Sequence, residues 1–390
     1  VPCNVIADEI LSDHPDRYRA MIVETANPAH SLADSKRFAE ALDSLDTVVV
    51  IDIAMSETAR HADYVLPAST QYEKWEATFF NFEFPDNYFH LRKPLFEAEG
   101  DSLPEAEIHA RLVVAMGAMP EQLCSELVAA LEEGGRDAYR TRFMQAMAED
   151  PTVSDLAPVI LYRTLGPSLP EGAAAAAPLW PIAIGFAVKE SAALARAGFE
   201  GDPLSQGDAL FDAILAGHSG VVFSRDTDES SWSRLGHEGR VRLDLPDMLD
   251  ELAVLNQAPE DPASADYPFV LMAGERRDYS ANTIYRHAGW RRKDPAGSLR
   301  MSPDDAERLG VPEGGQVRII TEVGSALAPV EITGRMLPGH ISLPNGFGLD
   351  NQDGERSGVA TNELTSVERR DRFAGTPHHK FLPARVEAVA

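Results

Sequence analysis

The sequence contains very little cysteine and no long hydrophobic run. Its 390 residues include only two cysteines, Cys3 and Cys124. Two thiols are too few for a structural zinc, an iron–sulfur cluster or a disulfide framework, so neither is predicted to bind a metal. No segment approaches the roughly 18 consecutive apolar residues of a membrane-spanning helix. We therefore predict a cytoplasmic protein without a membrane span.

Positive charge is also scarce. The chain has 35 Lys and Arg residues against 62 Asp and Glu residues, a formal net charge of -27. Nucleic acids and anionic membranes attract basic surfaces, so we expect binding to neither. A local basic site for an anionic ligand is still compatible with this total. The other proportions, 44% hydrophobic and 25% charged residues, are those of a globular protein, and the length suits two or three domains.

Strand and helix patterns alternate in the first part of the chain. Ala20–Val23, Thr47–Ile53 and Asp63–Pro67 are predicted strands, and a helical pattern separates the first two. Strand, helix and strand within about 35 residues predict a βαβ unit with a parallel sheet. Ligands of such sheets bind beyond the carboxyl ends of the strands, where Asn27 and Asp52 lie. The alternative for Asp52 is an ordinary helix cap or loop acid.

The middle of the chain gives few chemical cues. Three helices are predicted before its richest Ala, Pro and Gly stretch, over 105–117, Gln122–Glu133 and Arg140–Glu149. Beyond them we predict a helix over Ala209–Leu215 and a strand over Arg240–Leu245. We interpret the region as connecting structure. The predicted domains are 1–150, 151–264 and 265–390.

The last part of the chain is rich in short β patterns. Predicted strands cover Phe269–Ala273, Gln316–Thr321, Ala328–Thr333, His340–Leu343 and a run near Ala384–Val389. One helix is predicted over Pro303–Leu309, with Ser302 as its cap and Gly310 just past its end. Several strands with a single helix favour a small β-barrel.

The loop that follows Phe269–Ala273 is dense in polar side chains. It begins at Gly274 and carries Arg276, Arg277, Asp278, Tyr279, Ser280, Asn282 and Thr283. Such a group of donors suits an anionic ligand that forms many hydrogen bonds at the end of the strand. The alternative is a solvated loop whose arginines are surface charge.

Four passages occur in an order and spacing that point to one family. They are 23–30; 48–59 with 62–68 and 73–74; 269–283; and 302–310 with 338–339, 362–365 and 375–380. Together they resemble the molybdopterin oxidoreductases of the dimethyl sulfoxide reductase superfamily, which holds formate dehydrogenases and nitrate reductases. The resemblance implies an α/β fold, in which a Rossmann-like parallel-sheet domain precedes a small double-psi-like β-barrel.

The resemblance also implies a cofactor and the residues that hold it. The family binds bis-molybdopterin guanine dinucleotide with molybdenum or tungsten, one guanosine arm in each of two domains. The first arm would be lined by Asn27, Asp52, Lys74 and Glu107. The second arm and the pterin would be held by Gly274, Arg276, Arg277, Tyr279, Asn282, Thr283, Phe347, Asn362 and Lys380.

The chemistry of these side chains suits such a ligand. A carboxylate such as that of Asp52 can accept from both N–H groups of the guanine edge, and Asn362 can both donate and accept. Lysine supplies point charge to a pyrophosphate, and arginine makes forked contacts to phosphate. Core packing is an alternative role for Phe347, and the polar face of a helix explains Glu107 equally well. Two positions depart from the family pattern, Glu275 where many relatives have Arg and Trp75 where Gly is common.

The resemblance assigns the reaction elsewhere. In the family it occurs at the metal, and an amino-terminal cysteine cluster commonly holds a 4Fe–4S centre; both belong to earlier domains. The chain begins with Val-Pro-Cys-Asn rather than Met, so we expect part of a longer polypeptide with amino-terminal domains and an electron-transfer partner. The prediction is the cofactor-holding part of an oxidoreductase for a small substrate such as formate or an oxyanion. No catalytic or metal-ligating residue is assigned to this chain.

Three other functions are weighed against this one. The first is a redox-inactive nucleotide- or pterin-binding protein that keeps only the guanosine pockets. The second is a hydrolase, but its nearest motif, Gly217-His-Ser-Gly-Val221, lacks the closing glycine of a nucleophile elbow. The third is a purely structural subunit, which does not explain the donor-rich loop at Gly274.

Overall fold

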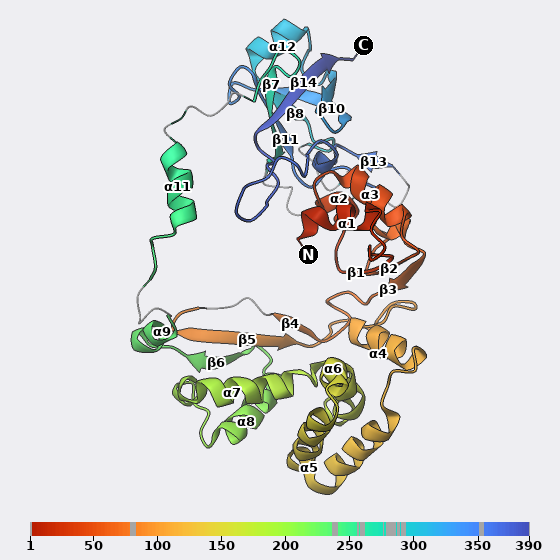
Figure 1. The fold of residues 1–390 in the computed structure, drawn as a ribbon, viewed down its shortest axis with the longest axis vertical. Helices are drawn as coiled ribbons and strands as arrows, with labels where there is room; N and C mark the ends of the chain where they lie inside the picture. Colours follow the sequence, from red (N-terminus) through yellow and green to blue (C-terminus); the bar gives the residue numbers. More distant parts are fainter. Residues whose placement is uncertain are drawn as a thin grey trace. The chain divides into compact units, whose positions relative to one another are not determined.

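The protein forms two compact units. A computed structural model describes residues 2–78, 83–235, 241–255, 257, 262–275, 277, 286, 289, 294–350 and 355–389. The first unit combines Val1–Leu66 with Ala253–Ala390, and the second is Pro67–Leu252 (Figure 1). The second unit is thus inserted into the sequence of the first.

A small sheet with helices on it forms the amino-terminal part of the first unit. Its strands β1 (Ala20–Glu24), β2 (Thr47–Asp52) and β3 (Tyr64–Pro67) lie in the order β1-β2-β3, and β1 pairs with β2 in parallel. Helices α1 (Ile6–Leu11), α2 (Pro28–Ser31) and α3 (Ser35–Asp43) precede β1 or connect it to β2. Phe38 and Leu42 of α3 pack with Val23, Val48 and Val50 of the strands. The predicted parallel pairing is confirmed.

A closed barrel forms the carboxy-terminal part of the first unit. Its strands are β7 (Phe269–Glu275), β8 (Leu299–Met301), β9 (Gln316–Ile320), β10 (Ser325–Ile332), β11 (His340–Pro344) and β14 (Leu382–Ala388), in the order β10-β8-β11-β7-β14-β9. The pairs β7–β11 and β8–β10 are parallel. Phe269, Leu271 and Ala273 alternate along β7 and belong to the barrel core, as the period of two in a strand requires. The predicted β-barrel is confirmed.

Short elements complete the barrel region. Helix α12 (Pro303–Leu309) begins at the predicted cap, where the Ser302 hydroxyl accepts from the Asp305 N–H at 3.2 Å. It ends at Gly310, whose φ of 66° is the left-handed conformation that glycine adopts readily. Strands β12 (Leu349–Asp350) and β13 (Arg356–Ser357) form a separate ribbon, followed by the 3₁₀ helix η6 (Thr361–Glu363).

The second unit joins a small antiparallel sheet to a layer of helices. The sheet has the order β4 (Glu76–Thr78), β5 (Asp86–Arg92) and β6 (Val221–Arg225). The helices are α4 (Glu105–Ala115), α5 (Glu121–Glu149), α6 (Thr152–Thr164), α7 (Leu179–Arg196), α8 (Pro203–Ala216), α9 (Asp228–Arg234) and α11 (Pro246–Val254). Their core contains the buried side chains of Tyr139, Trp180 and Phe211.

The region predicted as connecting structure is a folded part of this unit. Residues of α6, α7 and α8 pack in one core with residues of α5. The boundary between the units therefore differs from the predicted boundaries at 150 and 264. Helices that are apolar on most of their surface show only weak hydrophobic periodicity. For this reason the sequence did not indicate that these helices share a core.

Two local predictions in the second unit had opposite outcomes. The predicted helices Gln122–Glu133 and Arg140–Glu149 are the two arms of α5, which is interrupted by non-helical Gly134 and by Gly135 at a φ of 64°. The predicted strand Arg240–Leu245 is wrong, because residues 241–245 lie in no strand. Leu243 is 82% exposed there, so its apolar pattern has no sheet to join.

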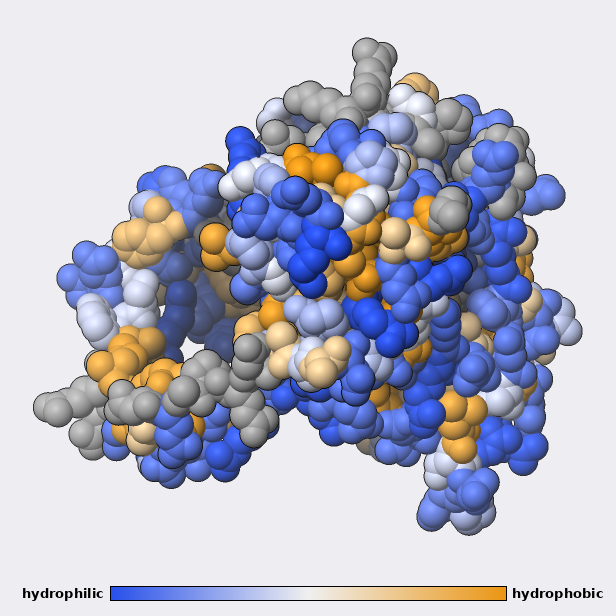
Figure 2. All heavy atoms as spheres, turned by 90° about the horizontal axis from the view of Figure 1, so that it is seen from above, coloured by the Kyte–Doolittle hydropathy of each residue, from blue (hydrophilic) through white to orange (hydrophobic). Residues whose placement is uncertain are grey.

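Figure 2 shows a face covered mainly by hydrophilic residues, with hydrophobic residues gathered in small patches. Within the described parts of the chain, no helix combines the length and the apolar character needed to cross a bilayer.

Candidate functional site

Asn27 and Asp52 lie at the carboxyl edge of the parallel sheet. Asp52 is the last residue of β2, and Asn27 follows β1 directly before α2. The Asp52 carboxylate accepts from the Ala54 N–H at 3.2 Å and from the Ser56 hydroxyl at 3.1 Å. It is only half-buried. These contacts fold the loop after β2 and leave lone pairs on both carboxylate oxygens.

Asn27 fastens the same loop to the start of α2. Its Oδ1 accepts from the backbone N–H of Thr58 at 3.0 Å and from the Thr58 hydroxyl at 2.8 Å. Its Nδ2 donates to Oε2 of Glu57 at 2.6 Å. One N–H of the amide is left for another acceptor. The structure therefore brings Asn27 and the loop of Asp52 together, as predicted for neighbouring parallel strands.

Glu57 is the centre of a network that the sequence did not reveal. Its carboxylate accepts from both terminal nitrogens of Arg286, at 2.8 and 3.0 Å, and from the Asp350 N–H at 2.8 Å. Burial raises the pKa of Glu57, but the hydrogen bonds from Arg286, Asp350 and Asn27 outweigh it and lower the pKa to about 2. The network joins the sheet edge to the barrel region.

Asn362 makes a second link within the first unit. From η6 its Nδ2 donates to the backbone oxygen of His30 in α2 at 2.9 Å, and its Oδ1 accepts from the Thr365 hydroxyl at 3.2 Å. His30 is buried, and burial is the main cause that lowers its pKa. Asn362 retains one N–H and one lone pair, so its side chain can still both donate and accept.

Gly274, Phe347 and Lys380 are grouped at one end of the barrel. The parallel strands β7 and β11 both end there, and β14, antiparallel to β7, begins there. Gly274 has a φ of 95°, and a side chain at its Cβ position would meet no atom within 4 Å. The His379 carbonyl accepts from the Ala273 N–H at 2.8 Å, which places the residue before Lys380 beside β7. Lys380 itself is exposed.

Phe347 is part of the packing at this end. Its side chain is 1% exposed. A Cβ at Gly297 or at Gly358 would lie 2.7 Å from the Phe347 ring, and both glycines have positive φ. The two glycines therefore leave the space that the ring fills. The structure supports the packing role that the sequence offered as an alternative.

Arg277 lies in a buried ion cluster. Its side chain is 2% exposed and contacts the carboxylates of Asp294, Glu275 and Glu331, the last two at 3.4 and 3.5 Å. It also donates to the Ser298 carbonyl at 3.0 Å. A guanidinium with these partners holds the start of the loop in place. The sequence had instead predicted that Arg277 contacts a phosphate.

Glu275, the departure from the family pattern, belongs to the same cluster. It pairs with Arg300 and accepts from the Ser342 hydroxyl at 2.8 Å. Burial opposes the charge of Arg300, but attraction to Glu275 and Glu331 outweighs it and raises the pKa of Arg300. The charge of Glu275 is therefore balanced by neighbouring strands of the barrel. Its carboxylate has hydrogen-bonding partners within the fold.

Lys74 and Glu107 lie in the second unit, whereas Asn27 and Asp52 lie in the first. The Lys74 ammonium pairs with Glu105 and lies 3.5 Å from a carboxylate oxygen of Glu76. Glu107 accepts from Arg111 at 2.7 Å and from the Tyr162 hydroxyl at 2.8 Å. The Lys74 ammonium is thus paired with carboxylates, and the Glu107 carboxylate accepts hydrogen bonds from a guanidinium and a hydroxyl.

Four predicted cofactor contacts lie outside the described residues: Arg276, Tyr279, Asn282 and Thr283. They stay predictions. Of the donor-rich loop, the structure describes Gly274, Glu275 and Arg277, and Arg286 beyond it.

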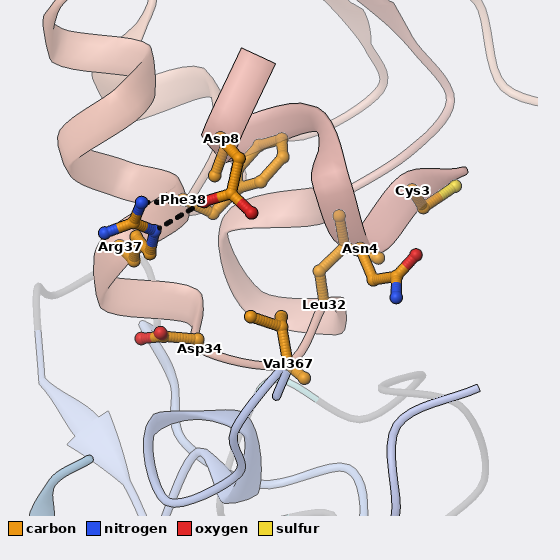
Figure 3. A pocket seen from close by; sticks show the side chains of 10 residues that line it. Cys3, Asn4, Asp8, Leu32, Asp34, Arg37, Phe38 and Val367 are labelled. Carbon is orange, nitrogen blue, oxygen red and sulfur yellow. Dashed lines mark hydrogen bonds and ion pairs between the residues drawn. The ribbon is translucent and has the colours of Figure 1, made fainter. Parts of the chain in front are cut away.

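Two cavities of the first unit are too small for a dinucleotide. A polar cavity of about 180 Å³ lies beside Glu57 and is lined by charged residues that include Arg60, Asp350 and Glu363. A second one, of about 10 Å³, has the size of one water molecule. Figure 3 shows the Asp8–Arg37 ion pair on one side of it and Cys3 on the other.

No described part of the chain forms a metal site from protein side chains. Among the described residues, no three His, Cys, Asp or Glu side chains are arranged to hold an ion. Cys3 is exposed and Cys124 is buried, and neither forms a disulfide. Burial raises the pKa of the Cys124 thiol, which makes it unreactive.

The polar network of Glu57 is the main feature that sequence reasoning missed. Glu57 lies in one of the four family passages, 48–59, but no role was predicted for it. The signal available was the position of an acid just beyond a buried strand, close to Asp52. Its partner Arg286 is 229 positions away, and no local pattern connects the two.

Comparisons with known proteins identify two domains. The model "Molybdopterin oxidoreductase" matches residues 11–113, and the model "Molydopterin dinucleotide binding domain" matches residues 269–383. The first match covers the parallel sheet with Asn27 and Asp52, and the second covers the barrel with Gly274, Asn362 and Lys380. The resemblance stated from the sequence is confirmed.

Individual relatives match over shorter stretches. A Staphylococcus aureus (strain bovine RF122 / ET3-1) protein named as a formate dehydrogenase is 29% identical over 112 residues, 29% of this chain and 11% of that protein. Trimethylamine-N-oxide reductase of Vibrio vulnificus (strain YJ016) is 43% identical over 60 residues, 15% of this chain and 7% of that protein. The matched stretches are a small part of these relatives' length.

A solved structure shares the fold. Acetylene hydratase from Pelobacter acetylenicus aligns with a TM-score of 0.56 and 17% identity, over 100% of this chain and 47% of that chain. The chain therefore corresponds to about half of that protein. At this identity the likeness concerns the fold alone.

Proposed function

We propose a function from the premise that this chain belongs to the molybdopterin oxidoreductase family: it holds a bis-molybdopterin guanine dinucleotide by its two guanosine arms. One arm would bind at the carboxyl edge of the β1–β2 sheet and the other at the barrel end of β7. The finer features of the cofactor, its guanine form and its molybdenum or tungsten, are part of this proposal.

For the first arm, the proposal rests on the spare capacity of Asp52. Two of the roughly four lone-pair positions of its carboxylate are used within the loop. The others can accept the adjacent N–H groups of a guanine edge. Ile53 and Met55, in the same loop, are 62% and 57% exposed and offer apolar contact to a planar base. Asn27 can donate its remaining N–H.

For the second arm, the contacts would come from Gly274, Asn362 and Lys380. The absence of a side chain at Gly274 lets a ligand approach the backbone, and Lys380 supplies an exposed positive charge for a phosphate. The free donor and acceptor of Asn362 match a ring edge that carries both. Four further residues stay predicted contacts of this arm: Arg276, Tyr279, Asn282 and Thr283. Lys74 and Glu107 stay predicted contacts of the first arm.

The observation that carries the proposal is the Glu57 network. It ties Asn27 at the sheet edge to Arg286 and Asp350 in the barrel region. Asn27 and Asp52 at the sheet edge and Gly274, Asn362 and Lys380 in the barrel region thus belong to one unit, and the network is a hydrogen-bonded connection between the two regions. Rigid support of this kind is what holding a large cofactor requires.

The residues of this chain would bind and orient, and the bound cofactor would supply two-electron redox chemistry at its metal. The family is a class of enzymes, and we assign the reaction, with a small substrate such as formate or an oxyanion, to the whole protein rather than to this chain. A 4Fe–4S centre would lie outside this chain, as would the contact with an electron-transfer partner. Two unpaired cysteines suit a cytoplasmic location.

The test is selective nucleotide binding by the purified 390-residue chain. Calorimetric titration should show tighter binding of GDP than of ADP. Asp52→Ala should weaken GDP binding by about tenfold or more, because it removes charge-assisted hydrogen bonds of about 1.5–3 kcal/mol. The matched control is Asp13→Ala, which changes an exposed acid and should leave both affinities unchanged. Equal GDP affinity of Asp52→Ala and the parent chain would show that the pocket is misplaced.

A further inference from the structure

Helix α11 has an apolar face that is exposed among the described residues. Leu245, directly before the helix, and Met248, Leu249 and Leu252 within it follow a spacing of three and four residues. They are 41%, 47%, 49% and 58% exposed. No described residue of α11 is buried. Asp247 and Asp250 lie on the opposite face, so the helix is amphipathic.

A helix of this length requires a partner. α11 has nine residues, and isolated helices shorter than about 12–15 residues are marginal in water. Most helices in proteins are stabilised by packing of their apolar face. The sequence of α11 is therefore suited to a docked helix.

An apolar groove lies open in the same unit. It has a volume of about 260 Å³, and all of its lining residues are apolar: Phe89, Leu179, Ile182, Ala183, Phe186, Leu210, Ile214 and Phe223. They come from β5, β6, α7 and α8. Ile182 is 63% exposed on its rim. Pro246 to Leu252 belong to the unit that contains this groove.

The chain connection allows α11 to reach the groove. The end of α9 lies near α7, because Arg234 pairs with Glu190 at 3.3 Å. Phe186 of the groove precedes Glu190 by one helical turn, roughly 6 Å along the axis. Residues 236–245 join α9 to α11 and span up to about 35 Å when extended.

Charge also favours this occupant. Ile182, Phe186 and Lys189 are spaced by four and three residues along α7, so exposed Lys189 continues the groove wall. The polar side of α11 carries Asp247 and Asp250. An acidic amphipathic helix is thus complementary to an apolar groove with a lysine at its end.

We propose that α11 docks in this groove of its own chain, with Leu245, Met248, Leu249 and Leu252 as the buried anchors. The docked state fixes the segment that leads from the second unit back to the barrel. This inference is independent of cofactor binding.

Disulfide trapping tests the contact. In a background of Cys3→Ser and Cys124→Ala, the pair Ile182→Cys and Leu249→Cys should form an intramolecular disulfide under mild oxidation. The control pair, Ile182→Cys and Asp250→Cys, places the second thiol on the opposite face and should react at least tenfold more slowly. Equal rates would show a mobile tether without docking, and a disulfide-linked dimer would show that a second copy fills the groove. Either outcome overturns the proposal.

Hydrogen exchange of the unmodified chain provides a second measurement. The amides of Asp247–Val254 should be protected in the parent chain and should exchange at least tenfold faster in Ile182→Asp. Val188→Asp is the matched control, because it changes an exposed apolar residue of α7 outside the groove lining. Unchanged exchange of α11 in Ile182→Asp overturns the proposal, whether or not the second unit is otherwise stable.

Discussion

The sheet edge and the barrel end use acidic residues in opposite ways. Asp52 ends β2 and Glu275 ends β7, and each follows a buried apolar strand. Among the described residues, Asp52 contacts one N–H and one hydroxyl, both of its own loop. Glu275 contacts Arg277, Arg300 and Ser342. An acid at the end of a strand is therefore available to a ligand only where no cation of the fold already neutralises it.

The same distinction applies to the predicted cations. Arg277 is buried among carboxylates, and Lys74 is paired with Glu105, whereas Lys380 is exposed. All three were selected from the sequence for the same positive charge. Their partners in the fold, rather than their residue types, separate supporting roles from binding roles.

The largest expected effect comes from breaking the barrel cluster. Arg277→Ala would leave Glu275 and Asp294 in a buried site without their shared partner. Loss of one side of a buried ion pair costs about 3–5 kcal/mol. Urea unfolding followed by hydrogen exchange of β7 and β11 should report this loss, and Arg372→Ala, at an exposed position, should not. A loss below about 1 kcal/mol would contradict a structural role for Arg277.

The sheet edge should be sensitive to acid through Glu57. Its folded pKa of about 2 lies below the ordinary value of 4.5, so its stabilising contribution is present above pH 4.5 and is lost as the pH falls toward 2. A shift of this size corresponds to about 3 kcal/mol. Glu57→Gln should remove this part of the pH dependence of unfolding, and the exposed Glu40→Gln should retain it. An identical pH profile for Glu57→Gln and the parent chain would contradict the network.

A smaller effect is expected at Asn362, which has both a structural and a proposed binding role. Asn362→Ala removes the hydrogen bond to the His30 carbonyl and should destabilise the first unit by about 1 kcal/mol. It should also weaken cofactor binding by up to about tenfold. Thr365→Val removes the neighbouring hydroxyl but keeps the amide, and it separates the two readouts. Binding that falls equally in both variants would indicate a purely structural role.

Local patterns in the sequence predicted much of the fold. The apolar runs Thr47–Ile53 and Phe269–Ala273 are typical of buried strands, and both lie in strands of the structure. Ser302 and Gly310 specify the ends of α12 through capping. These signals lie within a few residues of one another, so one sequence is enough to detect them.

The partners of the site residues were beyond such reasoning. The pairing of Glu57 with Arg286 and that of Glu275 with Arg300 depend on strands and loops that meet only in the folded unit. The residue type marks a charge, but the position of the opposite charge is a property of the tertiary structure. For this reason Asn27 and Asp52 were found at the sheet edge, while the anchoring of Arg277 was not foreseen.

The interrupted sequence of the first unit has a consequence for protein synthesis. The Glu57–Arg286 contact bridges 229 positions, and the whole of Pro67–Leu252 leaves the ribosome between its two halves. The second unit can therefore fold while the β1–β2 sheet still lacks the barrel. Completion of the network around Glu57 is a late event, so a cofactor that needs both half-sites can be inserted only after the carboxy-terminal barrel has been made.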